Sequence, residues 1–283
     1  MRCWMIFAFA ISSFAQSILM EAPELVAKLN QTGLVLLHVG TPEDFAQAHL
    51  PGAQLITLQD LSQSGPGGLR LEMPPTAQLA ATLEKYGVTN QSEVVIYSGN
   101  DSFQSATRIW FTFEYLTLPA RFLNGGLAYW RSQGLPVTQD TRAAKASSGL
   151  QVKPRPDLIV DAAYLAAQKE QGAFALIDAR TPNFYSGAEA GIAPRAGHIP
   201  GARNAPFPGF FAADKRFKAP QELAAALGPG DNFVTYCHIG MQATVPYFAA
   251  RLVGKTVRLY DGSFQDWSQR SELPVAKLPV AKD

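Results

Sequence analysis

Cysteine is nearly absent from this chain, which has only Cys3 and Cys237 among its 283 residues. No Cys-x-x-Cys pair is present, and no Cys/His spacing is typical of a zinc site. If the N-terminal segment is removed, as argued below, Cys237 has no partner for an internal disulfide. Cys237 is therefore either an inert packing residue or a site of chemistry.

An excess of charge is also missing, because 24 basic and 23 acidic side chains leave a net charge of +1. No stripe of Lys and Arg with interleaved aromatic residues is present, so we expect no nucleic-acid partner. Apolar residues make up 47% of the chain and charged residues 17%, which is typical of a packed globular protein. The length favours roughly two domains.

A membrane-spanning run is not seen at the N terminus, where the apolar stretch from Cys3 to Phe14 is shorter than the roughly 20 residues that a helix needs. The first residues, "MRCWMIFAFAISSFAQ", combine a basic Arg2, this apolar run and a small-x-small end at Ser13-Phe14-Ala15. That pattern is typical of a short signal peptide, although a buried first strand or helix is the alternative. We expect residues 1–16 to direct export to the periplasm or the medium, with no membrane partner; without a signal function the protein would be cytoplasmic.

The chain repeats itself once. Residues 34–56, "LVLLHVGTPEDFAQAHLPGAQLI", match residues 174–207, "FALIDARTPNFYSGAEAGIAPRAGHIPGARNAPF", and residues 122–137, "FLNGGLAYWRSQGLPV", match residues 259–275, "LYDGSFQDWSQRSELPV". Equivalent residues keep nearly constant offsets, 140 from Thr41 to Thr181 and 137 from Trp130 to Trp267. We therefore expect two copies of one domain, at 21–138 and 157–280, joined by a polar linker at 139–156.

Strand-like and helix-like runs alternate within each copy. In the second copy we expect strands at 174–177, 232–236 and 257–260, and helices at 221–227 and 243–252. Pro246 falls inside the last helix, which predicts a kink or a late helix start. The alternation predicts an α/β fold, with a mostly parallel sheet covered by helices on both faces in each domain. Ligands bind beyond the carboxyl ends of such strands, and Cys237 directly follows one.

The segment after that strand, "CHIGMQA", must turn within a few residues into a helix. Gly240 supplies the backbone freedom that such a curl needs. Main-chain N–H groups that point into the curl form an anion nest, and the helix start adds further donors and a partial positive charge. We expect this cradle to lower the pKa of the Cys237 thiol below about 8.5, which would make a nucleophile without a neighbouring base.

The alternative for Cys237 is a buried packing residue. The first copy has Ser98 at the equivalent position, in "VVIYSGNDSFQSATRIW", where the loop is longer and lacks the His-Ile-Gly curl. One copy therefore combines a compact cradle with a thiol and the other has neither, which favours chemistry at Cys237.

Taken together, the motifs resemble those of tandem-domain rhodaneses, sulfurtransferases of the thiosulfate/3-mercaptopyruvate type. The second copy has Asp178-x-Arg180, "GHIPGARN", "YCHIGMQA", which fits Cys-x-x-Gly-x-x-Ala, and "LYDGSFQDW". The first copy has "AHLPGA", "SATRIW" and "LNGGLAYW", as inactive rhodanese halves do. The resemblance covers nearly everything after residue 20 and implies two tandem rhodanese-like domains, of which only the second is catalytic.

The resemblance also implies a reaction. The Cys237 thiolate would take the sulfane sulfur of a small anionic donor, thiosulfate or 3-mercaptopyruvate, and the resulting persulfide would pass it to a thiophilic acceptor such as cyanide, sulfite or a thiol. No metal or organic cofactor is implied, and we expect a monomer. The loop residues that would cradle the sulfur are His238, Ile239, Gly240, Met241 and Gln242.

The donor stays open, because this chain departs from both subfamilies. Thiosulfate-specific relatives carry basic residues directly after the cysteine, where this chain has His238 and Ile239. Mercaptopyruvate-specific relatives carry Gly-Ser there, and arginines after the Asp-x-Arg, where this chain has Phe184. Arg195 could substitute for such an arginine. Neutral His238 could donate one hydrogen bond, protonated His238 could attract an anion, and a solvent-facing loop residue is the alternative.

Arg180 has two interpretations. It could form a structural ion pair near the loop with Asp178, or it could bind an anionic donor, and we favour the ion pair. The first copy has His38 and Gly40 at these positions, which agrees with an inactive half. Four residues recur in matching motifs of both halves and are expected to be architectural: His49, His198, Trp130 and Trp267.

Two rival functions remain. A phosphatase of related fold would need Cys-x5-Arg to hold phosphate, but the sixth residue after Cys237 is Ala243. A non-enzymatic sulfur carrier, or a persulfide-binding module for a protein partner, fits the same cradle, and the sequence does not separate it from an enzyme.

The N-terminal pattern makes a testable prediction. When the full chain is expressed in a host that exports proteins, the mature product is expected to lack residues 1–16, because the small residues before the polar sequence suit a signal peptidase. Intact-mass measurement of the exported fraction checks this. Recovery of full-length protein only inside the cytoplasm would contradict it.

Overall fold

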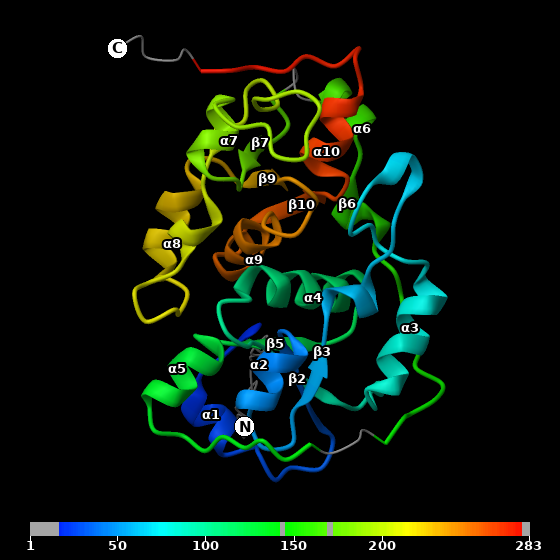
Figure 1. Cartoon of the computed structure of the whole chain (residues 1–283), viewed down its shortest axis with the longest axis vertical. Helices are drawn as coiled ribbons and strands as arrows, with labels where there is room; N and C mark the ends of the chain where they lie inside the picture. Colours follow the sequence, from blue (N-terminus) through cyan, green and yellow to red (C-terminus); the bar gives the residue numbers. More distant parts are fainter. Residues whose placement is uncertain (1–16, 142–144, 169–171, 279–283) are drawn as a thin grey trace, which may run out of the picture.

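The computed structural model describes residues 17–141, 145–168 and 172–278 and shows two halves of one architecture (Figure 1). Each half has a five-stranded sheet, in the order β1-β5-β4-β2-β3 and β6-β10-β9-β7-β8, and all strand pairs are parallel. The order is the same in both halves, which confirms the duplicated α/β fold expected from the repeat. The expected signal peptide lies outside the described residues, and none of the helices within them is long and apolar enough to cross a membrane.

The first half contributes the elements up to residue 132. Its strands are β1 (Leu19–Met20), β2 (Leu34–Val39), β3 (Gln54–Ile56), β4 (Glu93–Ser98) and β5 (Ala120–Leu123). Its α-helices are α1 (Ala22–Val26), α2 (Pro42–Gln47), α3 (Thr76–Lys85), α4 (Phe103–Tyr115) and α5 (Gly126–Ser132), with 3-10 turns at Leu58–Leu61 and Pro66–Gly68.

The second half repeats this series. Its strands are β6 (Ile159–Val160), β7 (Ala175–Asp178), β8 (Arg203–Asn204), β9 (Asn232–Tyr236) and β10 (Thr256–Tyr260). Its α-helices are α6 (Ala162–Gln168), α7 (Pro182–Ser186), α8 (Pro220–Leu227), α9 (Thr244–Leu252) and α10 (Ser263–Gln269), with 3-10 turns at Pro156–Leu158 and Phe207–Phe210. The three strands and two helices expected from the sequence are all present, with ends shifted by one residue at most.

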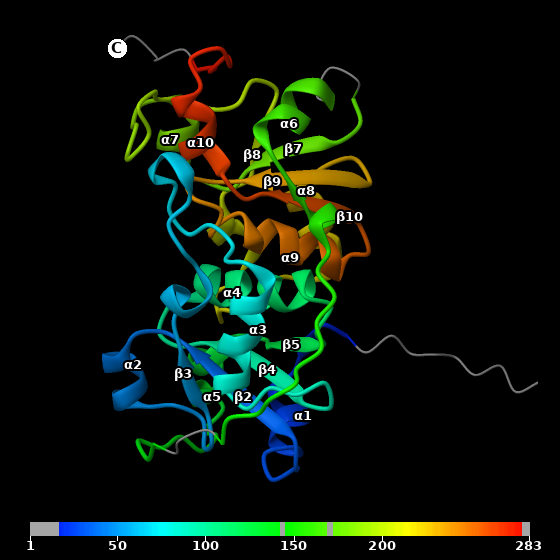
Figure 2. The same cartoon turned by 90° about the vertical axis from the view of Figure 1, so that its right-hand side faces the viewer.

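Helices α4 and α9 lie face to face between the two sheets (Figures 1 and 2). One continuous apolar core runs from the first sheet through both helices to the second sheet. Aromatic pairs cross this interface, with ring centroids 4.6 Å apart for Trp110 and Phe248 and 4.9 Å apart for Phe111 and Tyr247. The halves therefore share a core, as a single folded domain does.

The outer face of each sheet is covered by a separate, smaller core. In the first half the cluster includes Leu25 of α1 and Trp130 of α5, and in the second half it includes Leu165 of α6 and Trp267 of α10. Helices thus cover both faces of each sheet, as expected. The indole N–H groups of Trp130 and Trp267 donate to the carbonyls of Pro136 and Pro274, both over 2.8 Å, so the two anchors are equivalent.

The linker after the first half is tied to the fold, although most of its described side chains are exposed. The N–H of Lys153 donates to Leu116 O over 3.0 Å, and that of Arg155 donates to Tyr115 O over 2.7 Å. Leu150 is buried in the shared core. The linker therefore runs along the first half rather than away from it.

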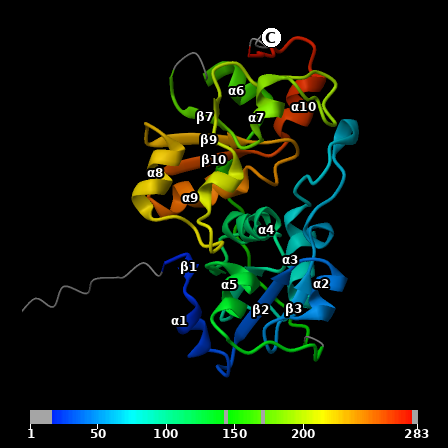
Figure 3. The same ribbon diagram turned by 60° about the vertical axis from the view of Figure 1, so that its left-hand side comes forward.

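Each half also extends an arm across the other (Figure 3). The first arm, residues 62–73, brings the N–H of Met73 to Asp261 Oδ2 over 3.3 Å. The second arm, residues 208–218, brings the N–H of Phe217 to Asn124 Oδ1 over 2.9 Å. Asn124 and Asp261 are equivalent positions of the repeat, 137 residues apart, so the arms make reciprocal contacts.

Candidate active site

Cys237 directly follows the central strand of the second sheet, at its carboxyl end. The chain turns at Gly240, whose φ is 81°, and α9 begins at Thr244. Pro246 is therefore the third residue of the helix, within the first turn, where its missing N–H breaks no helical hydrogen bond. Of the two outcomes expected for Pro246, the structure has the late start.

The Cys237 sulfur is ringed by main-chain donors. The main-chain N–H groups of Ala243, Ile239, Gln242 and Gly240 lie close enough to it that each acts to lower the pKa of the thiol. Cys237 itself is 0% exposed. These donors have no competing water at the sulfur, and they would stabilise any negative charge that forms there.

The acidity of the thiol differs from the expectation. Burial raises the pKa of the Cys237 thiol above its ordinary value, and the four hydrogen bonds offset only part of this effect. The expected lowering of the thiol pKa is therefore wrong in direction. The donors of the nest are present, but removing the sulfur from water disfavours the thiolate more strongly.

The start of α10 supports the main chain of Cys237, a contact that the sequence reasoning missed. Ser263 Oγ accepts from the N–H of Cys237 over 3.1 Å, and the N–H groups of Phe264 and Gln265 donate to the carbonyls of Cys237 and His238, both over 3.0 Å. Ser263 holds a φ of 53°, a left-handed conformation. The repeat contained a signal for this, because the first copy has a glycine at the equivalent position, Gly126, with a φ of 56°.

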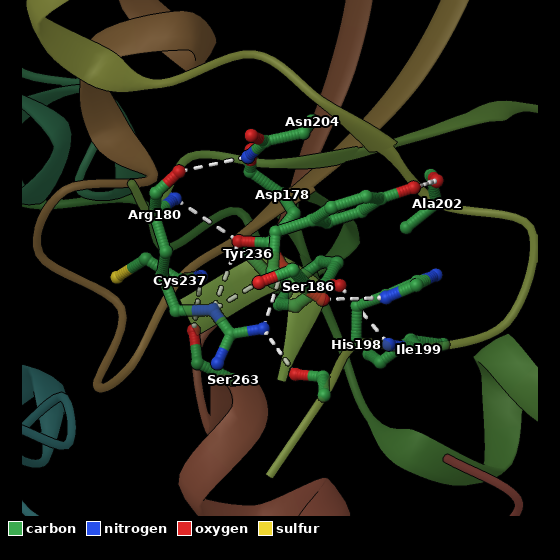
Figure 4. A network of polar contacts seen from close by, with 12 residues as sticks. Asp178, Arg180, Ser186, His198, Ile199, Ala202, Asn204, Tyr236, Cys237 and Ser263 are labelled. Carbon is green, nitrogen blue, oxygen red and sulfur yellow. Dashed lines mark hydrogen bonds and ion pairs between the residues drawn. The ribbon is translucent and has the colours of Figure 1, made fainter. Parts of the chain in front are cut away.

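Asp178 and Arg180 form a fully buried pair beside Cys237 (Figure 4). Arg180 Nε donates to Asp178 Oδ1 over 3.0 Å, and Nη2 donates to Asp178 Oδ2 over 2.6 Å and to Gly197 O over 2.8 Å. The guanidinium lies 4.1 Å from the ring centroid of Phe264. The pair thus packs on α10, the helix that holds the Cys237 carbonyl, and it has the geometry of a structural support.

Arg195 lies in a different environment from the one considered above. Its guanidinium donates to four main-chain carbonyls at the end of α10 and beyond it, those of Ser268, Leu273, Trp267 and Arg270, over 2.6–3.1 Å. A guanidinium used in this way caps the carbonyl end of a helix. Arg195 therefore stabilises the end of α10. Its guanidinium N–H groups are directed to these carbonyls and are not available to a substrate carboxylate.

The rim of the loop is apolar and carries no free cation among its described residues. His238 is half-buried, and its ring meets that of Phe184 edge-on, with centroids 4.3 Å apart. Burial, assisted by the charge of Arg180, lowers the pKa of His238 to about 4, so the imidazole is neutral at physiological pH. Ile239, Met241 and Gln242 are half-buried as well.

The first half also contributes to this rim. Ser105 of α4 donates to the Met241 sulfur over 3.6 Å. Ser105 also lines a cavity of about 240 Å³ at the carboxyl end of the first sheet, together with Gly40, Thr41 and Ser102. The first half thus contacts the loop at Met241, and the cavity itself is lined by residues of the first half.

The equivalent site of the first half has lost the charged pair. His38 replaces Asp178, is 0% exposed, and places Nδ1 3.1 Å from the hydroxyl of Tyr97. Ser98, at the position of Cys237, donates its hydroxyl to the neighbouring Gly99 carbonyl over 3.0 Å. His49 and His198, by contrast, are equivalent in the two halves: Nδ1 of each donates over 2.7 Å to a carbonyl, of Phe45 and Tyr185 respectively.

No metal centre is found in the part of the chain that the structure describes, because no group of three or more His, Cys, Asp or Glu residues is placed to hold an ion there.

Comparison with known proteins places this architecture in a family. The model of the Rhodanese-like domain matches residues 21–133 and 161–270. The chain is 34% identical over 279 residues to the probable 3-mercaptopyruvate sulfurtransferase of Pseudomonas aeruginosa, covering 91% of this chain and 97% of that protein. It is 29% identical to the putative thiosulfate sulfurtransferase of Synechococcus elongatus, covering 89% of this chain and 82% of that protein.

Solved structures share the fold. A complex of EanB with ergothioneine superposes with a TM-score of 0.82 at 23% identity, over 93% of this chain and 70% of that one. The crystal structure of YnjE gives a TM-score of 0.80 at 23% identity, over 93% of this chain and 68% of that one. With its duplicated parallel sheets and both of its halves matched by the same family model, the chain belongs to the rhodanese-like family, as a tandem-domain member of the sulfurtransferase type.

Proposed function

We propose that the protein transfers a sulfane sulfur from thiosulfate or 3-mercaptopyruvate to a thiophilic acceptor, cyanide or a thiol, through a persulfide on Cys237. The observation that carries the proposal is the convergence of four main-chain N–H groups on a single buried sulfur. A cysteine that only packs in the core gains nothing from surrounding N–H donors, whereas an anionic sulfur intermediate is stabilised by them.

The proposed sulfur transfer takes two steps, and neither step needs a cofactor. The Cys237 thiolate attacks the outer sulfur of thiosulfate, the donor's S–S bond breaks, and sulfite leaves with the electron pair. The persulfide anion that forms is held by the N–H groups of the loop. Cyanide then attacks the outer sulfur, the persulfide S–S bond breaks, thiocyanate leaves, and the Cys237 thiolate is restored.

The supporting residues have separate roles in this proposal. Asp178 and Arg180 neutralise each other and hold α10 against the Cys237 carbonyl, so Arg180 acts as a support rather than as a donor-binding residue. His238 is neutral and shapes the mouth with Phe184. Since Arg195 braces α10, recognition of an anionic donor rests on the loop amides.

The persulfide has a parallel in a protein of the same fold, because a structure of EanB shows ergothioneine covalently linked with a cysteine persulfide.

A second candidate function is a sulfur carrier that hands the persulfide to a protein partner. It is favoured by the resemblance to the sulfur carrier protein TtuD of Thermus thermophilus, 30% identical over 81% of this chain and 85% of that protein.

The first prediction concerns Cys237 itself. Incubating the protein with thiosulfate, or separately with 3-mercaptopyruvate, is expected to add one sulfur mass that cyanide removes, as read by intact-mass spectrometry. Cys237→Ser is expected to gain no sulfur and to keep its melting temperature within a few degrees, because serine has nearly the same shape. The donor that loads faster identifies the subfamily.

In the full-length chain, which keeps residues 1–16, Cys3→Ser serves as the control for that experiment and is expected to load normally. Loading of Cys237→Ser would contradict the mechanism. Loading without turnover to small acceptors would favour the carrier over the enzyme.

The second prediction concerns pH. Because the pKa of the Cys237 thiol is raised, the thiol is protonated at neutral pH, and the single-turnover loading rate should rise about tenfold per pH unit through neutrality. His238, with a pKa of about 4, should add no inflection near its ordinary value. A loading rate that is flat from pH 6 to about pH 8 would show a preformed thiolate and contradict this assignment.

The third prediction concerns Gly240. Its φ is 81°, and a Cβ there would lie 2.7 Å from Asp261 Oδ1. Gly240→Ala should therefore displace the loop N–H groups, lower the free energy of unfolding by about 1–3 kcal/mol, and slow sulfur loading at least tenfold. Gly254→Ala is the matched control, because Gly254 has a φ of 72° but nothing within 4 Å of its Cβ position. Equal loading rates in the two variants would refute a cradling role for the loop.

A further inference from the structure

We propose that Arg108, a residue of the first half, is a positioning residue for the catalytic loop of the second half. Its ion pair with Asp261 holds Gly240 in place and neutralises the Asp261 carboxylate, which lies against the loop at Gly240. The inference rests on the proposed function, because only a loop that carries out chemistry needs its amides fixed in this way.

The pair lies directly against the loop. Arg108 on α4 is 3% exposed and Asp261, just after β10, is 4% exposed. Arg108 Nη1 is paired with Asp261 Oδ1, and Nη2 donates to Leu71 O over 2.8 Å. A Cβ on Gly240 would lie 2.7 Å from Asp261 Oδ1 and 3.5 Å from Arg108 Nη1. No side chain therefore separates the ion pair from the Gly240 main chain, whose N–H acts to lower the pKa of the Cys237 thiol.

The first arm secures the same region from a second direction (Figure 2). The N–H of Met73 reaches the other Asp261 oxygen over 3.3 Å. The main chain of Arg70 exchanges two hydrogen bonds with the Gln265 side chain, over 3.0 and 2.9 Å, and the N–H of Gln265 holds the His238 carbonyl. The first half thus contacts the loop through Asp261 and through α10.

The internal repeat shows that the Arg108–Asp261 ion pair has no charged equivalent at the corresponding positions of the other half. At the offset of 137 that relates Trp130 to Trp267, Arg108 corresponds to Val245, and Asp261 corresponds to Asn124. The reciprocal arm contact is kept, because Asn124 accepts from the N–H of Phe217. Docking of the halves therefore needs no charge at these positions, and the charged pair occurs only behind the loop that carries the cysteine.

The expected consequence of losing Arg108 follows from electrostatics. A carboxylate buried at Asp261 without its cationic partner would repel an anion on the Cys237 sulfur and would draw the Gly240 segment out of place. Glu72 of the first arm also faces the pair, and burial, assisted by the Asp261 charge, raises its pKa to about 7. Asp261 therefore depends on Arg108 for compensation, since Glu72 can only add negative charge.

The test compares Arg108→Met with a matched arginine of the first half. Arg121 is 8% exposed and is paired, away from the loop, with Glu24, whose side chain is 41% exposed; Arg121→Met therefore removes a buried guanidinium of the first half without leaving a buried carboxylate. Two quantities are measured in each variant: the midpoint of thiolate ultraviolet absorbance against pH, taken as the difference from the same variant carrying Cys237→Ser, and the single-turnover rate of sulfur loading by intact mass.

Arg108→Met is expected to move the thiolate midpoint upward and to slow loading about tenfold, whereas Arg121→Met should leave both unchanged. Arg108→Lys keeps the charge but loses the two-pronged contact with Asp261 and Leu71, so it should lie between Arg108→Met and the parent. The double variant Arg108→Met/Asp261→Asn removes the uncompensated charge and should return the midpoint toward the parent value.

Identical titration midpoints and loading rates in Arg108→Met and Arg121→Met would overturn the inference. If Arg108→Met does not fold, Arg108→Lys carries the same test, and a parent-like midpoint and rate there would overturn it equally. Failure of the proposed function is distinguishable, because it appears as absence of sulfur loading in the parent protein. The thiolate titration reports on the loop in either case.

Discussion

The structure depends on one constraint, a sulfur atom that is removed from water and surrounded by four main-chain N–H groups. Buried N–H groups need acceptors, and these four N–H groups lie around the Cys237 sulfur. The loop that carries these N–H groups cannot keep its conformation alone, because it is not part of a helix or a strand. It is fixed by the end of β9 on one side, the start of α9 on the other, and α10 beneath it.

This constraint explains where the buried charges around the Cys237 loop lie. The buried charges come in pairs, Asp178 with Arg180 and Asp261 with Arg108, and each pair supports an element that touches the loop. Burying an ion pair is costly or neutral for stability, so these pairs are better understood as fixing positions. In the first half, where no sulfur needs support, the equivalent positions hold His38, Gly40 and Asn124.

The duplicated architecture also shows what the first half contributes to the second. The side chains of Val245, Tyr247 and Phe248 on α9 are all 0% exposed, and α4 of the first half covers this helix. Without the first half, this apolar face would meet water, and the helix that begins at the cysteine loop would lose its packing. Since the two halves share one core, support for the loop comes from the whole chain.

The sequence by itself determined the duplication, the parallel α/β fold and the place of Cys237 at a strand end, because these follow from residue patterns that are local or that recur at a fixed offset. Pro246 predicted either a kink or a late start of α9, and the structure has the late start. Only the tertiary structure decided the direction of the thiol pKa shift, the use of Arg195 as a brace, and the support of the loop by Ser263 and Arg108. Each of these depends on burial or on a contact between residues far apart in the chain, and neither quantity can be read from residue types and spacing alone.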